Sequence, residues 1–95
     1  MVVSLIRLII ELPPLGSIKE KRRIVKSLID RIRLKYRVSV AEVDLHESLT
    51  FAEIGAAFVS NSRRLGESVM NKVLSYVEDN CEGRVSDASI MSERY

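Results

Sequence analysis

Two carboxylates and the only histidine of the chain stand at alternate positions, a spacing that could build a metal site. Glu42, Asp44 and His46 are each separated by one residue, so an extended strand would project all three side chains from one face. Carboxylate and imidazole groups are acceptable metal ligands. The same alternation is typical of a polar edge strand beside a loop, and we favour that interpretation. We therefore expect neither a metal ion nor a cofactor.

Residues that could serve as nucleophiles or bind phosphate in an active site are scarce. Cys81 is the only cysteine, which excludes an intramolecular disulfide and a zinc cluster. Its predicted place, on the apolar side of the last turn of a second helix, indicates a small core residue. The chain has no glycine-rich phosphate loop and no second histidine for a two-histidine zinc motif. Ferredoxin-like acylphosphatases need an arginine in the first strand–helix turn, where this chain has residues 13–17 (PPLGS). A substrate-sized active site would have to be built between two or more chains, so we expect no enzymatic activity.

Basic side chains are concentrated in one predicted helix. Residues 17–37 contain nine lysines and arginines against two acidic residues, whereas the whole chain has a net charge of +2. At 100° per residue, four of these cations fall within an arc of about 60° beside the apolar stripe, and a fifth lies next to it. The five are Lys19, Arg22, Lys26, Arg33 and, at the margin, Arg23. Towards the opposite flank lie Lys21, Arg31 and Lys35.

The cations at the start of this helix oppose its macrodipole, which favours negative charge there. Together with free backbone N–H groups, they create a positive field whose natural partner is phosphate. Such a surface suits the backbone of a nucleic acid rather than its bases, and the aromatic pattern of RNA-recognition modules is absent. The five cations are therefore the predicted nucleic-acid contacts. The alternative is a solvated helix face that maintains solubility.

Six segments switch between strand and helix periodicity. The Val-, Ile- and Leu-rich start of the chain indicates a central strand, and the polar last segment indicates an edge strand. The predicted elements are strands over 2–12, 37–45, 50–60 and 84–92, with helices over 17–36 and 63–80. Right-handed crossovers in this order place both helices on one face of an antiparallel sheet. We therefore predict an α+β fold, the ferredoxin-like β-α-β-β-α-β sandwich, as one domain over residues 1–95.

Caps and apolar stripes define the two predicted helices. Ser17 and Glu20 form a capping box in which the Ser17 hydroxyl accepts from the Glu20 amide and the Glu20 carboxylate accepts from the Ser17 amide. Asn61 and Ser62 can cap the second helix, and Gly83 ends it. The predicted core stripes are Ile18, Val25, Leu28, Ile29, Ile32 and Tyr36 in the first helix, and Leu65, Val69, Val73, Tyr76 and Val77, flanked by Met70 and Leu74, in the second.

A sandwich of this kind leaves one face of its sheet uncovered. If the even-numbered residues of the first strand face the helices, the uncovered residues are Val3, Leu5 and Ile9 with Arg7 and Glu11. In the opposite case, they are Val2, Ile6, Leu8 and Ile10. Exposed apolar surface usually marks an interface, so we expect a homo-oligomer formed through the sheet or an edge strand. Gly55 and its alanine neighbours would let a helix or a partner's backbone approach closely. Long charged side chains could instead cover the aliphatic residues.

The sequence also bears on the cellular location. No apolar run approaches the roughly 18–20 residues of a membrane span. The first residues lack the basic start and the small-residue cleavage site of a signal peptide. We therefore expect a cytoplasmic protein that does not associate with a membrane.

Three segments resemble, in order, the motifs of one bacterial family. Residues 16–23 (GSIKEKRR) resemble the "SLKEKR" signature of the YlxP-like proteins, domain of unknown function family 503. Residues 38–44 (VSVAEVD) and 59–63 (VSNSR) resemble two further motifs, so the match spans nearly the whole chain. Two departures stand out. Family members often have a stretch with Gln and Trp where this chain has residues 45–49 (LHESL), and often Asp where Ser62 stands.

The resemblance implies a ferredoxin-like fold and a partner rather than a reaction. Genes of the family often neighbour those for a translation initiation factor and ribosome-binding factor A, which implies a role around the small ribosomal subunit. Our hypothesis is a non-enzymatic module that associates with ribosomal RNA or the small ribosomal subunit through the basic first helix. The alternative is a homo-oligomeric interaction or small-ligand-binding module assembled through its open sheet face.

Overall fold

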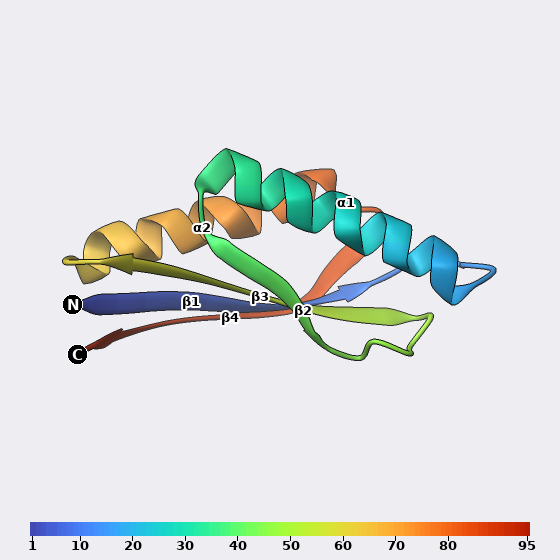
Figure 1. The fold of residues 1–95 in the computed structure, drawn as a ribbon, viewed down its shortest axis with the longest axis horizontal. Coiled ribbons are helices and arrows are strands. Elements are labelled where there is room, and N and C mark those ends of the chain that lie inside the picture. The colour runs from blue at the N-terminus through green and yellow to red at the C-terminus, as the bar shows by residue number, and fades with distance from the viewer.

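The computed structural model describes residues 1–95 and has the element order predicted from the sequence (Figure 1). The elements are β1 (Val2–Glu11), α1 (Ile18–Tyr36), β2 (Ser39–Asp44), β3 (Phe51–Ser60), α2 (Arg63–Asn80) and β4 (Arg84–Arg94). The strands form one sheet in the order β2-β3-β1-β4, and every neighbouring pair is antiparallel. Both helices cover the same face of this sheet, which confirms the ferredoxin-like sandwich. Neither helix combines the length and the apolar content that crossing a membrane requires.

The first and last strands occupy their predicted places in the sheet, and each strand matches its predicted range except for one or two residues at its ends. β1 is central, between β3 and β4, and β4 is an edge strand, as predicted. β2 begins at Ser39 instead of residue 37 because Arg37 adopts a left-handed conformation (φ 54°) that ends α1. β4 extends past residue 92 to Arg94, because it pairs with β1 as far as Val2.

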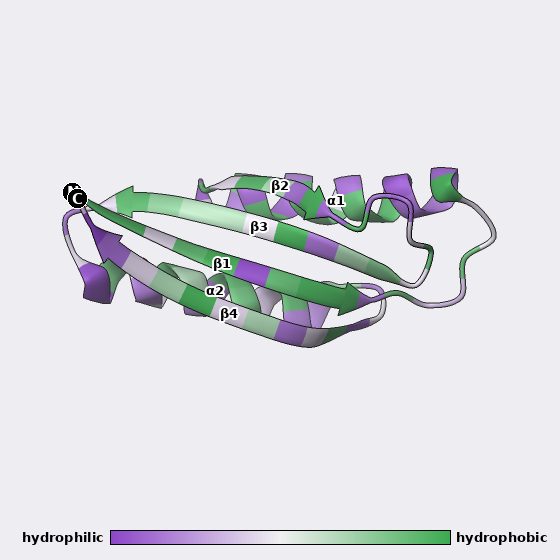
Figure 2. Cartoon of the chain, turned by 90° about the horizontal axis from the view of Figure 1, so that it is seen from below, coloured by the Kyte–Doolittle hydropathy of each residue, from purple (hydrophilic) through white to green (hydrophobic).

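The even-numbered side chains of β1 face the helices, which decides between the two orientations of this strand that the sequence left open. Its buried residues are Val2, Ser4, Ile6, Leu8 and Ile10. The open face of the sheet, seen in Figure 2, therefore carries Val3, Leu5, Arg7, Ile9 and Glu11. Leu5 lies opposite Ala57 of β3 and Met91 of β4 on that face.

Helix α1 lies over the β2 side of the sheet, and α2 lies over β1 and β4 (Figure 2). The buried residues of α1 are Lys21, Ile24, Val25, Leu28 and Ile32. The predicted stripe is correct at Val25, Leu28 and Ile32, but Ile18, Ile29 and Tyr36 are only half-buried. The buried arc is displaced towards Lys21, which was predicted on a flank of the helix. This displacement brings the Lys21 side chain within reach of β2.

A glycine fixes the approach of α2 to the sheet. The buried residues of α2 are Gly66, Met70, Val73 and Val77. A Cβ on Gly66 would overlap the side chain of Ser4 in β1, so the helix can approach β1 here only because this position has no side chain. Leu65, predicted in the stripe, is instead 49% exposed. Gly55 does not admit a helix, because it lies on the open face beside Val43 of β2.

Side-chain caps begin both helices. Ser17 Oγ accepts a hydrogen bond from the Glu20 amide at 3.2 Å, as predicted. The Glu20 carboxylate accepts from the Gly16 amide at 3.1 Å rather than from Ser17, so the return bond closes one residue earlier than expected. Ser62 Oγ accepts from the Leu65 amide at 3.1 Å and confirms the predicted start of α2.

Candidate nucleic-acid interface

The first turns of α1 carry exposed cations that have no acidic partner. Lys19, Arg22 and Arg23 are exposed and take part in no ion pair within the chain. We call these three residues the free basic cluster. Glu20, the acidic residue of the first turn, directs its carboxylate to the Gly16 amide instead. The positive charge of the cluster therefore remains available to an external anion.

The other two predicted contacts share one carboxylate. Lys26 Nζ lies 2.8 Å from Asp30 Oδ2, and Arg33 Nη1 lies 3.3 Å from Asp30 Oδ1. The hydrogen bond from Lys26, together with the charges of Lys26 and Arg33, holds the pKa of Asp30 below its ordinary value of 3.8. The Lys26 and Arg33 side chains are nevertheless 77% and 54% exposed. Both can contact an external anion, with Asp30 as a competing acceptor.

Arg33 also links α1 to β2 at the edge of the sheet by a hydrogen bond. Its Nη2 donates a hydrogen bond to the Val40 carbonyl of β2 at 2.9 Å. A shallow groove of about 430 Å³ lies between α1 and β2, and Arg22, Lys26 and Arg33 all line it. The structure therefore brings three of the five predicted contacts together, whereas Lys19 and Arg23 lie outside the lining of this groove.

One lysine of the basic segment is unavailable to any ligand. The Lys21 side chain is 1% exposed, and its Nζ lies 3.4 Å from Glu42 Oε2 of β2. The same ammonium donates to the carbonyl of Leu45, which adopts a left-handed conformation (φ 60°) at the start of the β2–β3 turn. Lys21 thus holds α1, β2 and this turn together from inside the protein.

The structure does not assemble the metal site considered for β2. Glu42 faces the helices and pairs with Lys21. The register of β2 against β3 shifts between Glu42 and Asp44, which breaks the alternation beyond Glu42. Asp44 accepts a hydrogen bond from the Leu45 amide at 2.7 Å, and His46 is exposed in the turn. No group of three or more His, Cys, Asp or Glu side chains is placed to hold a metal ion.

Cys81 lies just past α2 rather than within its last turn. It is the C-cap residue, and its amide donates to the Val77 carbonyl at 2.9 Å. Its half-buried side chain packs against the hydrophobic core, and burial raises the pKa of its thiol. Gly83 follows at φ 106° and turns the chain into β4 against the Glu11 carbonyl, where a Cβ would overlap the backbone. Cys81 therefore has the environment of a packing residue rather than that of a nucleophile.

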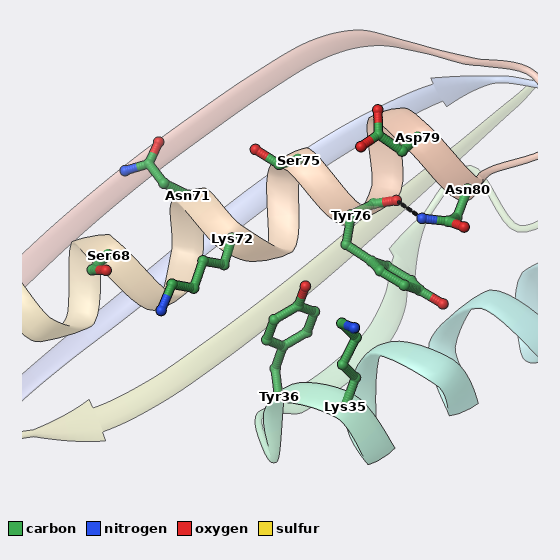
Figure 3. A pocket seen from close by; sticks show the side chains of 9 residues that line it. All are labelled: Lys35, Tyr36, Ser68, Asn71, Lys72, Ser75, Tyr76, Asp79 and Asn80. Atoms are coloured by element: carbon green, nitrogen blue, oxygen red, sulfur yellow. Dashed lines mark hydrogen bonds between the residues drawn. The ribbon is translucent and has the colours of Figure 1, made fainter.

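A second groove, which we did not predict, lies between the end of α1 and residues 68–80 of α2 (Figure 3). This inter-helix groove has a volume of about 470 Å³ and is lined mainly by polar side chains, among them Lys35, Tyr36, Ser68, Lys72, Ser75 and Tyr76. The Tyr36 and Tyr76 rings meet edge to face, with centroids 5.8 Å apart. Lys35 Nζ lies 5.9 Å and 5.4 Å from the two centroids. Polar residues spaced by four in α2 (Ser68, Lys72, Tyr76, Asn80) were the signal for this groove in the sequence.

The open face of the sheet combines exposed apolar side chains with the ion pairs of Arg7 and Arg84. Exposed aliphatic side chains come from all four strands: Leu5, Val43, Val59 and Met91 are 38%, 50%, 61% and 50% exposed. Between them, small residues of β2 and β3 leave a shallow hollow of about 350 Å³. Arg7 stands on this face, 3.5 Å from Glu53 and 3.6 Å from Asp87. Charged side chains thus cover this face only around Arg7 and at the end of β1, where Arg84 Nε lies 3.1 Å from Glu11 Oε1.

Comparisons with known proteins agree with the motifs and with the fold. The sequence matches the family described as "Protein of unknown function (DUF503)" over residues 3–90. It is 33% identical over 63 residues to "Uncharacterized protein YlxP" of Bacillus subtilis (strain 168), a match that covers 66% of this chain and 68% of that protein. Among solved structures, it is similar to the NMR structure of LFR1 1, a de novo designed protein with a ferredoxin fold.

The structural likeness has a TM-score of 0.55 at 14% identity and covers 98% of this chain and 83% of the designed protein. It therefore supports the fold alone. The family match, by contrast, includes the basic segment of α1, the Glu42 region of β2 and the start of α2. Since this match covers most of the chain, the protein belongs to the DUF503 family of proteins of unknown function.

Proposed function

We propose that this protein binds the phosphate backbone of RNA through helix α1, without catalysis, and that RNA of the small ribosomal subunit in the cytoplasm is its partner. The observation that carries the proposal is the free basic cluster, Lys19, Arg22 and Arg23, which is exposed and has no acidic partner in the chain. Phosphate is the ligand whose charge and geometry match such a group of lysine and arginine side chains.

Stability alone does not account for cations at these positions. Lys19, Arg22 and Arg23 lie in the first two turns of α1, where positive charge opposes the helix dipole by some tenths of a kcal/mol each. Acidic residues there would stabilise the helix. A local arrangement that disfavours the fold indicates a role outside the fold.

The groove beside β2 extends the proposed contact along the helix. Arg22 belongs both to the free basic cluster and to this groove, which Lys26 and Arg33 also line. A phosphate that enters the groove can replace Asp30 as the acceptor for Lys26 and for Arg33 Nη1. The proposed interface therefore runs from the first turn of α1 to the edge of β2. Buried Lys21 takes no part in it.

The test is co-sedimentation with purified small ribosomal subunits across a series of salt concentrations. The variant is Lys19→Glu/Arg22→Glu, and the matched control is Arg64→Glu/Arg94→Glu, which changes the net charge equally at exposed residues of α2 and β4. Glutamate is favourable in the first turns of a helix, so the variant should fold. We expect the variant to bind more weakly and to lower the slope of log affinity against log salt by roughly 1.5, about 0.7–0.9 per lost phosphate contact.

Two outcomes would contradict the proposal. Equal losses in the variant and the control would indicate a response to net charge rather than a contact on α1. Absence of binding by the unsubstituted protein at low salt would remove the ribosomal subunit as a direct partner. In that case a short oligouridylate tests whether the protein binds RNA phosphates at all.

A second candidate function is a homo-oligomeric module assembled through the open sheet face, and the exposed Leu5, Val43, Val59 and Met91 favour it. Sedimentation velocity over a range of protein concentrations tests this candidate with Leu5→Glu. The matched control is Leu34→Glu, which places the same charge at an exposed leucine of α1. We expect Leu5→Glu to abolish association and Leu34→Glu to leave it intact. A monomer at every concentration of the unsubstituted protein would reject this candidate.

A further inference from the structure

The inter-helix groove collects hydrogen-bond donors that have no partner in the chain. Lys35 comes from the last turn of α1 and Lys72 from the middle of α2, and neither takes part in an ion pair or a hydrogen bond. The hydroxyl groups of Tyr36 and Tyr76 make no hydrogen bond either. Burial raises the pKa of Tyr36, so its hydroxyl keeps its proton and remains a donor at neutral pH.

The two tyrosine rings of the groove hold the ammonium group of Lys35 in a defined place. Lys35 Nζ lies 5.4 Å from the Tyr76 centroid and 5.9 Å from the Tyr36 centroid, close enough for both rings to attract the ammonium. In the view of Figure 3, the Tyr36 hydroxyl points towards α2 between the Lys35 and Lys72 side chains. The lysine of α1 is therefore oriented before a ligand arrives, which lowers the entropy lost on binding.

The remaining side chains of the groove fit an anion with several acceptor oxygens. Ser68 and Ser75 add two hydroxyl groups to its wall. The amide group of Asn80 is already used, because its Nδ2 donates to the Tyr76 carbonyl at 2.9 Å. Asp79 is the one acidic residue of the lining, and its carboxylate points away from both lysines (Figure 3). The donors thus outnumber the acceptors on the open side of the groove.

We propose that the inter-helix groove is a binding site for a phosphate group, held by Lys35 and Lys72 with the Tyr36 and Tyr76 hydroxyls as further donors. Two ammonium groups and neutral hydroxyls around one open space are the chemistry that recognises a phosphate ester. Because the ammonium of Lys35 lies close to both aromatic rings, they are placed to orient Lys35 rather than to stack on a base. The phosphate belongs either to a free nucleotide or to an RNA backbone.

This site is separate from the interface proposed above. Lys26 and Arg33 line the groove on the β2 side of α1, whereas Lys35 and Tyr36 face α2. No residue lines both grooves. Either site can therefore fail its test while the other stands.

The test is an NMR titration of backbone amides with inorganic phosphate, compared with sodium chloride at the same ionic strength. We expect saturable shifts around Tyr36 and Tyr76 with phosphate alone. Lys35→Gln/Lys72→Gln should weaken phosphate binding at least about tenfold. Tyr36→Phe/Tyr76→Phe keeps both rings and should weaken it by about threefold to tenfold. Arg64→Gln/Arg94→Gln, which removes two exposed cations outside both proposed sites, should leave the affinity of the groove unchanged.

Shifts that are equal in chloride, or that persist in Lys35→Gln/Lys72→Gln, would overturn the proposal. An equal loss in Arg64→Gln/Arg94→Gln would also overturn it, because the response would then follow net charge. Adenosine monophosphate and a short oligouridylate distinguish the two sources of phosphate. Tighter binding of the mononucleotide supports a free nucleotide as the ligand. Tighter binding of the oligomer, lost in the lysine variant, supports an RNA backbone.

Discussion

Lys21 Nζ lies 3.4 Å from Glu42 Oε2, and this ion pair joins α1 to edge strand β2 within the helix–sheet interface. The two residues belong to the two segments, 16–23 and 38–44, that carry most of the family resemblance. Their side chains are 1% and 16% exposed. A requirement of the fold, rather than the binding of a ligand, therefore accounts for part of the sequence pattern that this chain shares with the family.

The Lys21–Glu42 pair should contribute strongly to stability when one partner alone is removed. Lys21→Met leaves the Glu42 carboxylate without its cation, and we expect the free energy of unfolding to fall by about 3 kcal/mol. Lys21→Met/Glu42→Leu removes both charges and should recover most of that loss. Urea unfolding of the two single variants and the double variant measures the coupling. If both losses simply add, Lys21 and Glu42 do not act as a pair.

Gly66 should tolerate no side chain. Gly66→Ala places a methyl group against Ser4, whose hydroxyl lies 2.7 Å from that of Ser92 in β4. We expect a loss of about 1–3 kcal/mol from overpacking, in spite of the better helix propensity of alanine. Gly16→Ala is the matched control, because a Cβ there meets its nearest neighbour, Glu20 Oε2, at 3.7 Å. Thermal unfolding of both variants decides the point, and equal melting temperatures would refute the close contact.

Loss of the negative charge of Asp30 should lower the stability of the fold and strengthen RNA binding. Its pKa lies below 3.8 in the folded protein, so its pairing stabilises the fold above the unfolded pKa. This stabilisation disappears as the pH falls through the folded pKa. Asp30→Asn should therefore be less stable than the unsubstituted protein near neutral pH and equally stable in strong acid, as measured by urea unfolding at several pH values.

The same variant should bind RNA more tightly near neutral pH, because Lys26 and Arg33 lose their competing carboxylate. Glu67→Gln, at an exposed residue of α2, is the matched control for net charge. An equal gain of affinity in both variants would show that Asp30 does not screen the proposed interface.

Cys81 should react slowly with thiol reagents in the folded protein. Burial raises the pKa of its thiol, so less thiolate is present at a given pH than in the unfolded chain. We expect the rate of reaction with Ellman's reagent, between about pH 7 and pH 9, to rise when urea unfolds the protein. Because the folded pKa is the higher one, deprotonation destabilises the fold as the pH rises through the unfolded pKa. Similar rates in the folded and unfolded states would contradict this environment.

The sequence predicted what local chemistry determines. Residue types and short-range periodicity were enough to predict the Ser17 and Ser62 caps. They also predicted the extent of β3 to within one residue and the central place of β1. The arc that a helix buries depends on its distant partners. Lys21 is buried because Glu42 meets it across the interface, and such a pairing leaves no trace in a helical wheel.

The same limit applies to the candidate sites. The helical wheel placed four cations on one side of α1: Lys19, Arg22, Lys26 and Arg33. It could not show that Arg33 forms an ion pair with Asp30 and a hydrogen bond to the Val40 carbonyl. It assigned Tyr36 and Tyr76 to the apolar stripes of separate helices. Only the packing angle of α1 against α2 brings their rings together and opens a polar groove beside them.

The hydrogen bond from Arg33 to the Val40 carbonyl has a consequence for the entropy of recognition. A free arginine side chain loses up to about 2 kcal/mol of rotamer freedom when a ligand immobilises it. Arg33 has lost part of that freedom on folding, so an anion that contacts Nη1 meets a guanidinium already held in place. Ordering of this contact is thereby coupled to the integrity of β2. A substitution that loosens β2 would weaken anion binding at Arg33 without removing any charge.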